Sequence, residues 1–498
     1  FAPAALGLCE LLSRSGRWAE ALAATTPLVA AEDVGEGLLS AHAVALRGLG
    51  RHEEALAVYR RAAGAFPGSA IALHNIAAVA CDLGRYEEAE AAARAAFAGG
   101  GDAPETWLTF GRALQGQARF AEAEAAYRSA LDRRPLDPEA HQALAHLLWM
   151  QTEDLAAASA TLDTALVTSP SSTPLRLIRS SLLDHAGESE AAYAALVSSP
   201  PDDDLRLQIA AARAALRLDP ARARAHAEAA LRAMPDDDQA ALALCEAHLA
   251  LGEPEPAAAL AERVRRRRPL DQHVLAYLAT AWRLLGDDRY AALYDYAAFV
   301  KPWTIETPPG WPDLAAYLVD LAAALNGLHG LRAHPIGQSL RGGAQTSQNL
   351  RASQQPAIAS FFQAVDAPIR AHLAALGAGK DPLRSRNTGR HALEGVWSVR
   401  LRPGDGRHVD HVHPRGWLSS ACYIALPQAV EAEGRQGWIK FGEPGTPTAP
   451  QLGPEHFVKP EPGRLVLFPS YMWHGTTPFG GDTPRLSMAF DLVPAGKS

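Results

Sequence analysis

The sequence predicts two different folds in one chain, an α-helical repeat superhelix followed by an antiparallel β jelly roll. Three observations predict this order. A 34-residue pattern recurs through the first 300 residues, a proline-rich segment at 301–314 interrupts it, and short β-rich segments separated by Gly, Pro and Asp follow Leu393. The chain has 498 residues, which is enough for two or more domains.

The repeat is clearest in four segments, GRWAEAL, GRHEEAL, GRYEEAE and ARFAEAE, which begin at Gly16, Gly50, Gly84 and Ala118. Each unit has a turn residue, an aromatic or histidine two residues later, and alanines where two helices would pack closely. This pattern resembles the tetratricopeptide repeat, a pair of antiparallel helices. We expect about eight helical pairs, whose superhelix would present a concave surface to a peptide or protein partner.

The segment KPWTIETPPGWPDL (301–314) contains four prolines and two tryptophans and ends the repeat pattern. We therefore expect a repeat array over 1–302, a helical and loop segment over 303–392, and a β core over 393–498. Within the middle part, 315–330 and 355–378 have the apolar spacing of helices. In the last part, many short strands with turn signals favour a jelly roll over an α/β sheet.

Composition excludes several other classes of protein. A formal net charge of −8 and a pI near 6.1 argue against a nucleic-acid partner. The sequence lacks an apolar run long enough to span a membrane. Four widely spaced cysteines without a C-x-x-C pair argue against a disulfide framework or thiolate zinc site and favour a cytoplasmic location. The chain begins at Phe1 rather than Met, so we expect its natural N-terminus to lie upstream; a homo-oligomer is compatible with the array.

A cluster of candidate metal ligands lies in HVDHVH (408–413), with a further histidine, His474, after a later strand. Alternate residues of an extended segment point the same way, so either His408 with Asp410 or His411 with His413 could converge on one ion. A histidine from a neighbouring strand would complete one face of an octahedron. The remaining positions would stay free for substrate and oxygen, as in non-haem Fe(II) oxygenases.

Arg485 and Ser487 would lie on one face of the strand PRLSMAF, eleven residues after His474. A guanidinium can clamp a carboxylate through two hydrogen bonds, and a nearby hydroxyl can add a third. A cosubstrate that chelates the metal at one end and carries a carboxylate at the other, such as 2-oxoglutarate, would fit. Weaker candidates are Tyr423 for the same carboxylate and, for the substrate entrance, Gln345, Thr346 and Arg400.

Three separated motifs occur in the order H-V-H-P-x-G-W-L-S-S-A, P-x-x-G-x-L-V-L-F-P-S-x-x-W-H-G-T and R-L-S-x-A-F-D. Together with the segment at 339–350, they resemble the 2-oxoglutarate/Fe(II)-dependent oxygenase family, whose bacterial members often carry tetratricopeptide repeats in front. The resemblance covers roughly 330–495 and implies a double-stranded β-helix, Fe(II), 2-oxoglutarate and O2. It also implies that His474 is the distal ligand and that Arg485 with Ser487 binds the cosubstrate's C5 carboxylate.

The pair of ligands that precedes His474 can be read in two registers. Most 2-oxoglutarate oxygenases use H-x-D, which fits His408 and Asp410, whereas the motif that this sequence resembles aligns on His411 and His413. We favour His411 and His413 with His474, and take His408 with Asp410 as the second choice. In the favoured register Asp410 or His408 would orient a ligand imidazole.

These observations predict an Fe(II)/2-oxoglutarate-dependent dioxygenase. A repeat array joined to an oxygenase suggests hydroxylation of an amino-acid side chain in a peptide or protein that the array holds. Two alternatives stay open. The protein could hydroxylate a small molecule and use its repeats only for assembly, or it could be a non-catalytic repeat scaffold with an inactive barrel.

Overall fold

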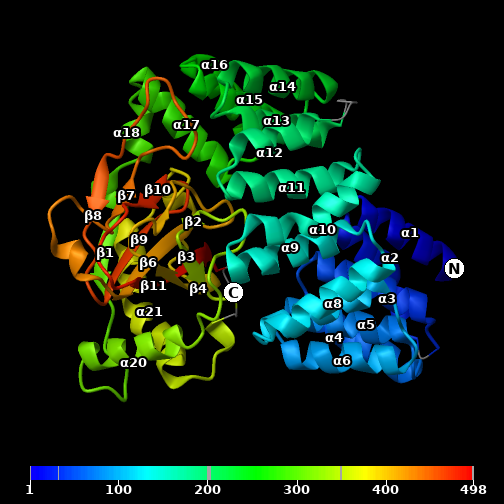
Figure 1. The fold of residues 1–498 in the computed structure, drawn as a ribbon. Coiled ribbons are helices and arrows are strands. Elements are labelled where there is room, and N and C mark those ends of the chain that lie inside the picture. The colour runs from blue at the N-terminus through cyan, green and yellow to red at the C-terminus, as the bar shows by residue number, and fades with distance from the viewer. Residues whose placement is uncertain (1, 32, 199–203, 348–349, 496–498) are drawn as a thin grey trace. The chain divides into compact units, whose positions relative to one another are not determined.

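The computed structural model describes residues 2–31, 33–198, 204–347 and 350–495, which divide into two compact units, 1–147 and 148–498 (Figure 1). The predicted fold class is confirmed, because a helical array precedes a strand-rich region. The repeat helices are α1 (Ala2–Arg14), α2 (Trp18–Val29), α3 (Glu36–Gly48), α4 (His52–Ala65), α5 (Ala70–Asp82), α6 (Tyr86–Ala98), α7 (Pro104–Gly116), α8 (Phe120–Arg133), α9 (Pro138–Thr152), α10 (Leu155–Thr168), α11 (Thr173–His185), α12 (Ser189–Val197), α13 (Leu205–Ala215), α14 (Pro220–Ala233), α15 (Asp238–Ala250), α16 (Pro254–Arg267) and α17 (Gln272–Leu285).

The 34-residue pattern corresponds to the turn inside each helical pair. Gly16, Gly50, Gly84 and Ala118 all have a positive φ, between 60° and 73°. A left-handed residue ends the first helix and reverses the chain, and glycine adopts it without steric cost. The second helix then begins two residues later, at Trp18, Tyr86 and the equivalent positions. The repeat in the sequence is therefore a repeat in backbone conformation.

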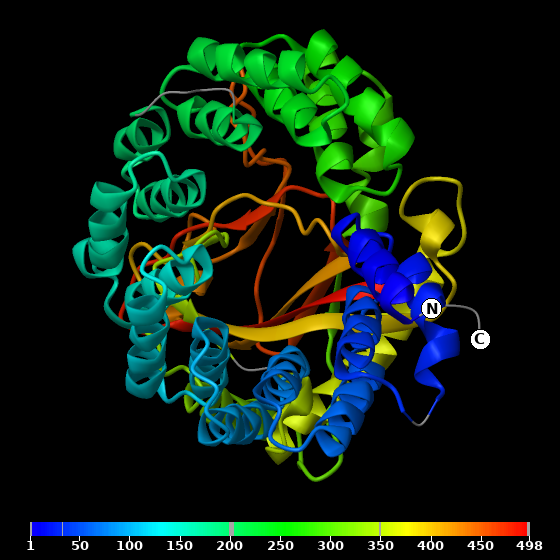
Figure 2. The same cartoon turned by 90° about the vertical axis from the view of Figure 1, so that its right-hand side faces the viewer.

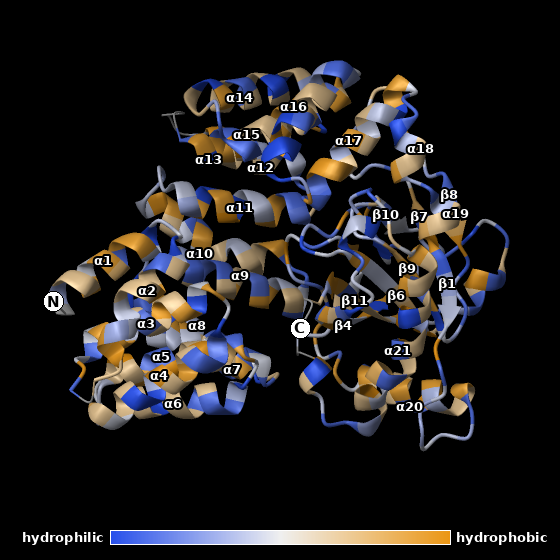
Figure 3. Cartoon of the chain, turned by 180° about the vertical axis from the view of Figure 1, so that it is seen from behind, coloured by the Kyte–Doolittle hydropathy of each residue, from blue (hydrophilic) through white to orange (hydrophobic). Residues whose placement is uncertain are grey.

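Close contacts between an aromatic ring and a helical glycine join neighbouring pairs. The ring of Tyr86, at the start of α6, lies against Gly116 at the end of α7, so that a Cβ at Gly116 would be 2.4 Å from the ring. Trp18 and Gly48 make the equivalent contact in the first pairs, where the corresponding distance is 2.2 Å. Each helix carries both hydrophobic and hydrophilic residues along its length (Figure 3), which is the amphipathic pattern of packed surface helices.

The strand-rich region, coloured mostly yellow to red in Figure 2, forms two main antiparallel sheets, and β2 and β5 pair as a third, two-stranded sheet. The larger sheet has the order β1-β9-β6-β11-β4-β3, and the smaller has the order β10-β7-β8. A short bridge between His411 and His474 adds the segment after β5 to the edge of the smaller sheet. The strands are β1 (Lys301–Thr304), β2 (Leu340–Arg341), β3 (Gly343–Gln345), β4 (His391–Leu401), β5 (Arg407–His408), β6 (Leu418–Ala425), β7 (Ile439–Phe441), β8 (His456–Val458), β9 (Arg464–Pro469), β10 (His474–Thr476) and β11 (Arg485–Pro494).

The proline-rich segment that ends the repeat pattern contributes a strand of its own. β1 pairs with β9 at the edge of the larger sheet, a position that tolerates Pro302 because an edge strand need not donate on both sides. Helices α20 and α21 pack against this sheet. The ring of Phe361, in α21, contacts that of Phe490 in β11, with ring centroids 6.1 Å apart. The helices that follow the repeats are α18 (Arg289–Leu293), α19 (Tyr296–Phe299), α20 (Leu314–Asn326) and α21 (Pro356–Leu376).

One hydrophobic core extends from Ala241 to Leu492, from the last repeats into the sheets. It includes Leu242 and Cys245 of α15, Leu278 of α17, and Phe441 and Phe468 of the strands. The last repeats and the strand-rich region therefore share a core within one compact unit. Of the helices in the described residues, none combines the length and the apolar character needed to cross a bilayer.

The contact between Tyr86 and Gly116 gives a testable stability difference within residues 1–147. Gly116→Ala should destabilise the protein by about 1–3 kcal/mol, because the new methyl group would overlap the Tyr86 ring. Gly64→Ala is the matched control: Gly64 lies in α4 with no atom within 4 Å of an added Cβ, and alanine should stabilise that helix by about 0.5–1 kcal/mol. Urea denaturation measures both, and equal effects would contradict the packing described.

Candidate metal centre

Two segments that are distant in the sequence pair to form the centre. The backbone N–H of His411 donates to the carbonyl of His474 (3.0 Å), and the N–H of His474 donates back to His411 (3.1 Å). The N–H of His413 donates to the carbonyl of Ser470, also at 3.0 Å. This antiparallel pairing places residues 411–413 beside 470–474, at the edge of the smaller sheet.

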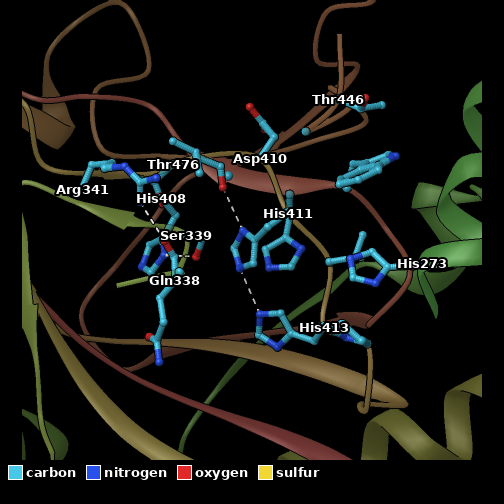
Figure 4. Close-up of a pocket in the computed structure, with 18 of the residues that line it drawn as sticks. His273, Gln338, Ser339, Arg341, His408, Asp410, His411, His413, Thr446 and Thr476 are labelled. Atoms are coloured by element: carbon cyan, nitrogen blue, oxygen red, sulfur yellow. Dashed lines mark hydrogen bonds between the residues drawn. The ribbon is translucent and has the colours of Figure 1, made fainter. Parts of the chain in front are cut away.

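The structure brings His411, His413 and His474 together, and one ring nitrogen of each lies within 4.8 Å of the others. The Nε2 atoms of His411 and His413 are 3.0 Å apart (Figure 4). His411 and His474 are the closest pair of rings, with centroids separated by 4.2 Å. Among the described residues, these three are the one group of His, Cys, Asp or Glu whose ligand atoms converge in this way.

Hydrogen bonds fix the orientation of all three rings. The Nδ1 of His411 donates to the carbonyl of Val409, and the Nδ1 of His474 donates to that of Met472, both at 2.9 Å. The Nδ1 of His413 donates to the carboxylate of Asp491 at 2.6 Å. Each Nδ1 therefore carries the proton, and each Nε2 offers a lone pair. Lone pairs directed at one another repel unless a proton or a metal ion lies between them, so the donor set fits a bound metal ion.

Burial keeps the imidazoles in the form that binds metal. Burial and the neighbouring His413 lower the pKa of His411 to about 3. Burial also holds the pKa of His474 well below its ordinary value. At neutral pH both rings are therefore uncharged.

Asp410 and His408, the second choice for the metal ligands, lie outside this group. Asp410 accepts a hydrogen bond from the ammonium of Lys440 at 2.8 Å, and burial raises the pKa of Asp410 to about 6. His408 stacks on His411 with ring centroids 5.7 Å apart, and its Nδ1 shares a hydrogen bond with the hydroxyl of Ser339. His408 therefore packs against the ring of His411, and Asp410 is bound by Lys440 outside the group of three histidines.

Arg485 is a buried cation that lacks a carboxylate partner among the described residues. Its side chain, on β11, is 3% exposed, and its guanidinium lies 4.9 Å from the centre of the Tyr423 ring. One guanidinium nitrogen donates to the hydroxyl of Thr476 at 3.2 Å, and none of the ion pairs includes Arg485. An unpaired buried charge is costly, so this position fits an incoming carboxylate.

A cavity of about 860 Å³ joins these parts (Figure 4). It is lined by the three histidines, Arg485, Ser487 and Gln345 on the side of the sheets. Tyr423 lies beneath Arg485, fully buried, rather than on the cavity surface. Opposite the sheets, the lining comes from repeat helices and includes Asp184 of α11, Arg213 of α13, Glu246 of α15, and His273 and Tyr277 of α17.

Two of the residues predicted for the substrate entrance lie away from this cavity. Thr346 is buried and exchanges two hydrogen bonds with the backbone of Ser398, each 3.0 Å long. Arg400 donates to the carbonyl of His329 and lines a separate cavity of about 420 Å³. Residues 348 and 349 of the segment at 339–350 lie outside the described residues.

Sequence reasoning missed three residues that shape the centre: Asp491, Lys440 and His273. Asp491 had a detectable signal, because 485, 487, 489 and 491 alternate along β11 and all four line the cavity. Lys440 and His273 had none, because β7 and helix α17 are brought to the histidines only by tertiary folding.

Comparison with known proteins agrees with this architecture. Residues 395–491 match the family model described as "Putative 2OG-Fe(II) oxygenase". Residues 40–104, 108–173 and 219–281 match tetratricopeptide repeat models, and residues 3–65 match a model of the bacterial transcriptional activator domain. The predicted combination of an oxygenase domain preceded by tetratricopeptide repeats is thereby confirmed. None of the curated proteins matches the chain.

Similar solved structures are repeat proteins. A tetratricopeptide repeat protein from Parabacteroides merdae is 17% identical, with a TM-score of 0.34, and the match covers 49% of this chain and 97% of that one. MamA from Desulfovibrio magneticus is 20% identical, with a TM-score of 0.30, and the match covers 34% and 97%.

The bond from His413 to Asp491 predicts a loss of metal affinity on substitution. Asp491→Asn should weaken binding of Zn(II) or Co(II) by roughly 10- to 100-fold, because the ring would lose the carboxylate that orients it and makes it more basic. Asp482→Asn, in an exposed loop, is the matched control and should bind as the native protein does. Competition with a chelator measures both constants, and equal affinities would exclude a role for Asp491 at the metal.

Buried neutral histidines also predict that the metal-free protein loses stability in acid. The folded-state pKa values of His408, His411 and His474 lie below the ordinary value, so the unfolded chain binds more protons as the pH falls. Their stabilisation is therefore complete above the ordinary histidine pKa of about 6.5 and declines below it. The raised pKa of Asp410 has the opposite effect on stability. Because three histidines oppose this one carboxyl, we expect the net stability to fall in acid.

The midpoint temperature of thermal unfolding should therefore not change with pH above about pH 7, and it should decrease steadily from there to about pH 5. Replacing His411 and His474 together by Gln should make this fall shallower. A midpoint that does not depend on pH across this range would contradict the assignment of these rings as buried and neutral.

Proposed function

We propose that the chain is an Fe(II)- and 2-oxoglutarate-dependent dioxygenase that hydroxylates an amino-acid side chain of a peptide or protein held by the repeat array. One observation carries the proposal. One ring nitrogen from each of three oriented histidines lies within 4.8 Å of the others, in the same cavity as a buried arginine that lacks a carboxylate partner among the described residues. In that cavity His411, His413 and His474 would hold Fe(II), which with 2-oxoglutarate supplies oxygen activation coupled to release of succinate and CO2.

The roles of the protein groups follow from their bonds. The three Nδ1 bonds hold the ligand rings before the metal arrives, so that little orientational entropy is lost on binding. Arg485 would bind the far carboxylate of 2-oxoglutarate, with Ser487 beside it on the same face of β11. Trp473, adjacent to His474, is 5% exposed and donates from its indole to Thr280, so it helps exclude water from that side.

The substrate class is inferred from the opposite wall of the cavity. Helices α11, α13, α15 and α17 supply that wall, so a polypeptide lying along the array would reach the metal. A small-molecule hydroxylase would need no such wall, although the cavity volume lies within the range of small-molecule sites. A scaffold with an inactive barrel is disfavoured by the intact histidines and Arg485.

Replacing Arg485 tests the cosubstrate assignment. Arg485→Ala should raise the KM for 2-oxoglutarate by roughly 100-fold or more, since truncating one side of a buried charge pair costs about 2–5 kcal/mol. Arg400→Ala is the matched control, because Arg400 lies on the neighbouring strand β4 outside the cavity. Succinate formation with Fe(II) measures both variants. Arg485→Ala with an unchanged KM, or native protein that forms no succinate, would overturn the proposal.

A further inference from the structure

Three of the repeat helices in the wall that faces the histidines are held together by buried polar groups. Glu246 of α15 is 6% exposed, and its carboxylate accepts a hydrogen bond from the hydroxyl of Tyr277 on α17. The same carboxylate lies 3.6 Å from the guanidinium of Arg213 on α13. These contacts fix α13, α15 and α17 relative to one another at the cavity surface, and they satisfy the charge of Glu246 internally.

The wall is also joined to the segment that carries His474. The indole N–H of Trp473 donates to the hydroxyl of Thr280 at 2.9 Å, and the Tyr277 and Trp473 ring centroids are 6.0 Å apart. Because Trp473 directly precedes His474, α17 lies at a fixed place beside the candidate metal position. A side chain on the cavity face of α17 is therefore placed as accurately as a residue of the sheets.

His273 is that side chain. It lines the cavity, and in Figure 4 its ring lies on the side of His411 that is opposite Arg341 and His408. It is half-buried and stacks on Tyr277, with ring centroids 6.0 Å apart and an angle of 12° between the planes. Neither of its ring nitrogens takes part in a hydrogen bond with the described residues. Burial lowers the pKa of His273, so the ring presents a neutral nitrogen to the cavity.

The charges around this nitrogen limit what it can bind. The nearby carboxylates already have partners: Glu246 has Arg213 and Tyr277, Asp410 has Lys440, and Asp491 has His413 and Ser419. The buried Arg485 is assigned to the cosubstrate. What remains beside the metal position is a neutral imidazole with one donor and one acceptor nitrogen, which match the carbonyl oxygen and the N–H of an amide group.

We propose that His273 is a substrate-binding residue, which hydrogen-bonds a neutral amide of a polypeptide substrate and so positions the target side chain at the metal. The amide is a peptide group or a carboxamide side chain, and the wall formed by α13, α15 and α17 is the surface along which the polypeptide lies. This inference rests on the proposed function and adds to it the residue and the chemistry of recognition. It also makes the last repeats part of the active site.

The test uses the full chain with Fe(II), 2-oxoglutarate and a library of short acetylated and amidated peptides with randomised flanks and each natural amino acid in turn at the centre. Succinate formation above the peptide-free rate, and a mass gain of one oxygen in the peptide, identify responding peptides. We expect uncharged central residues to respond. For them, His273→Ala should raise the peptide KM by roughly five- to tenfold, the loss of one neutral hydrogen bond, while the KM for 2-oxoglutarate stays within about twofold.

Two further variants separate binding from structure. His273→Asn retains a neutral hydrogen-bonding group and should recover most of the peptide affinity, whereas His273→Phe should not. His248→Ala is the matched control, because His248 is on α15 outside the cavity and bonds to Glu253. It should leave both KM values unchanged.

Three outcomes would overturn the inference while succinate formation still supports the proposed function. They are a peptide KM that is unchanged in His273→Ala, equal changes in both KM values, and a response restricted to peptides with a charged centre or absent from the whole library. Failure of the native protein to form succinate from 2-oxoglutarate would instead reject the proposed function itself.

Discussion

The candidate site depends on one pair of backbone hydrogen bonds, those between His411 and His474. They join two segments separated by a long stretch of sequence, and the pairing is antiparallel, so the two rings meet on the same side. Each ring then donates to the carbonyl two residues before it, Val409 in one segment and Met472 in the other. The two ligand segments are thus held in the same local conformation, and His413 enters the group through the additional bond to Ser470.

The three histidines are not equivalent, and the difference lies in their partners. Two of them donate to neutral carbonyls, whereas His413 donates to Asp491, which also accepts a hydrogen bond from Ser419 at 2.7 Å. A facial triad normally includes a carboxylate bound to the metal. Here the negative charge lies one bond further out and acts through an imidazole, so the candidate metal would still be partly compensated.

Much of this arrangement could be predicted from the sequence because it is local. The left-handed turns recur every 34 residues, and the motif containing His474 is contiguous with its strand. The choice between His408 with Asp410 and His411 with His413 could not be derived from alternation alone, since both pairs have the same spacing. It depends on which rings face β10 and on Lys440, a residue of β7 that holds Asp410 away.

Residues contributed by packing between distant elements could not be predicted at all. His273 reaches the cavity because α17 packs on Trp473, and periodicity within a helix does not reveal such a neighbour. Composition changes at the proline-rich segment, yet β1 within that segment completes the larger sheet. The boundary between the compact units falls between Leu147 and Leu148 rather than at that change in composition, because the last repeats and the strands share one core.

That continuous core has an evolutionary consequence. We expect repeats to be gained or lost at little cost only where the compact unit that holds the candidate site is not cut, which in this chain means before residue 148. We expect the repeats after that point, from α10 to α17, to change in sequence together with the strands, because they belong to the same compact unit and α17 bonds to Trp473 through Thr280. The two parts of one repeat array are thus expected to diverge at different rates, the first independently and the second together with the candidate site.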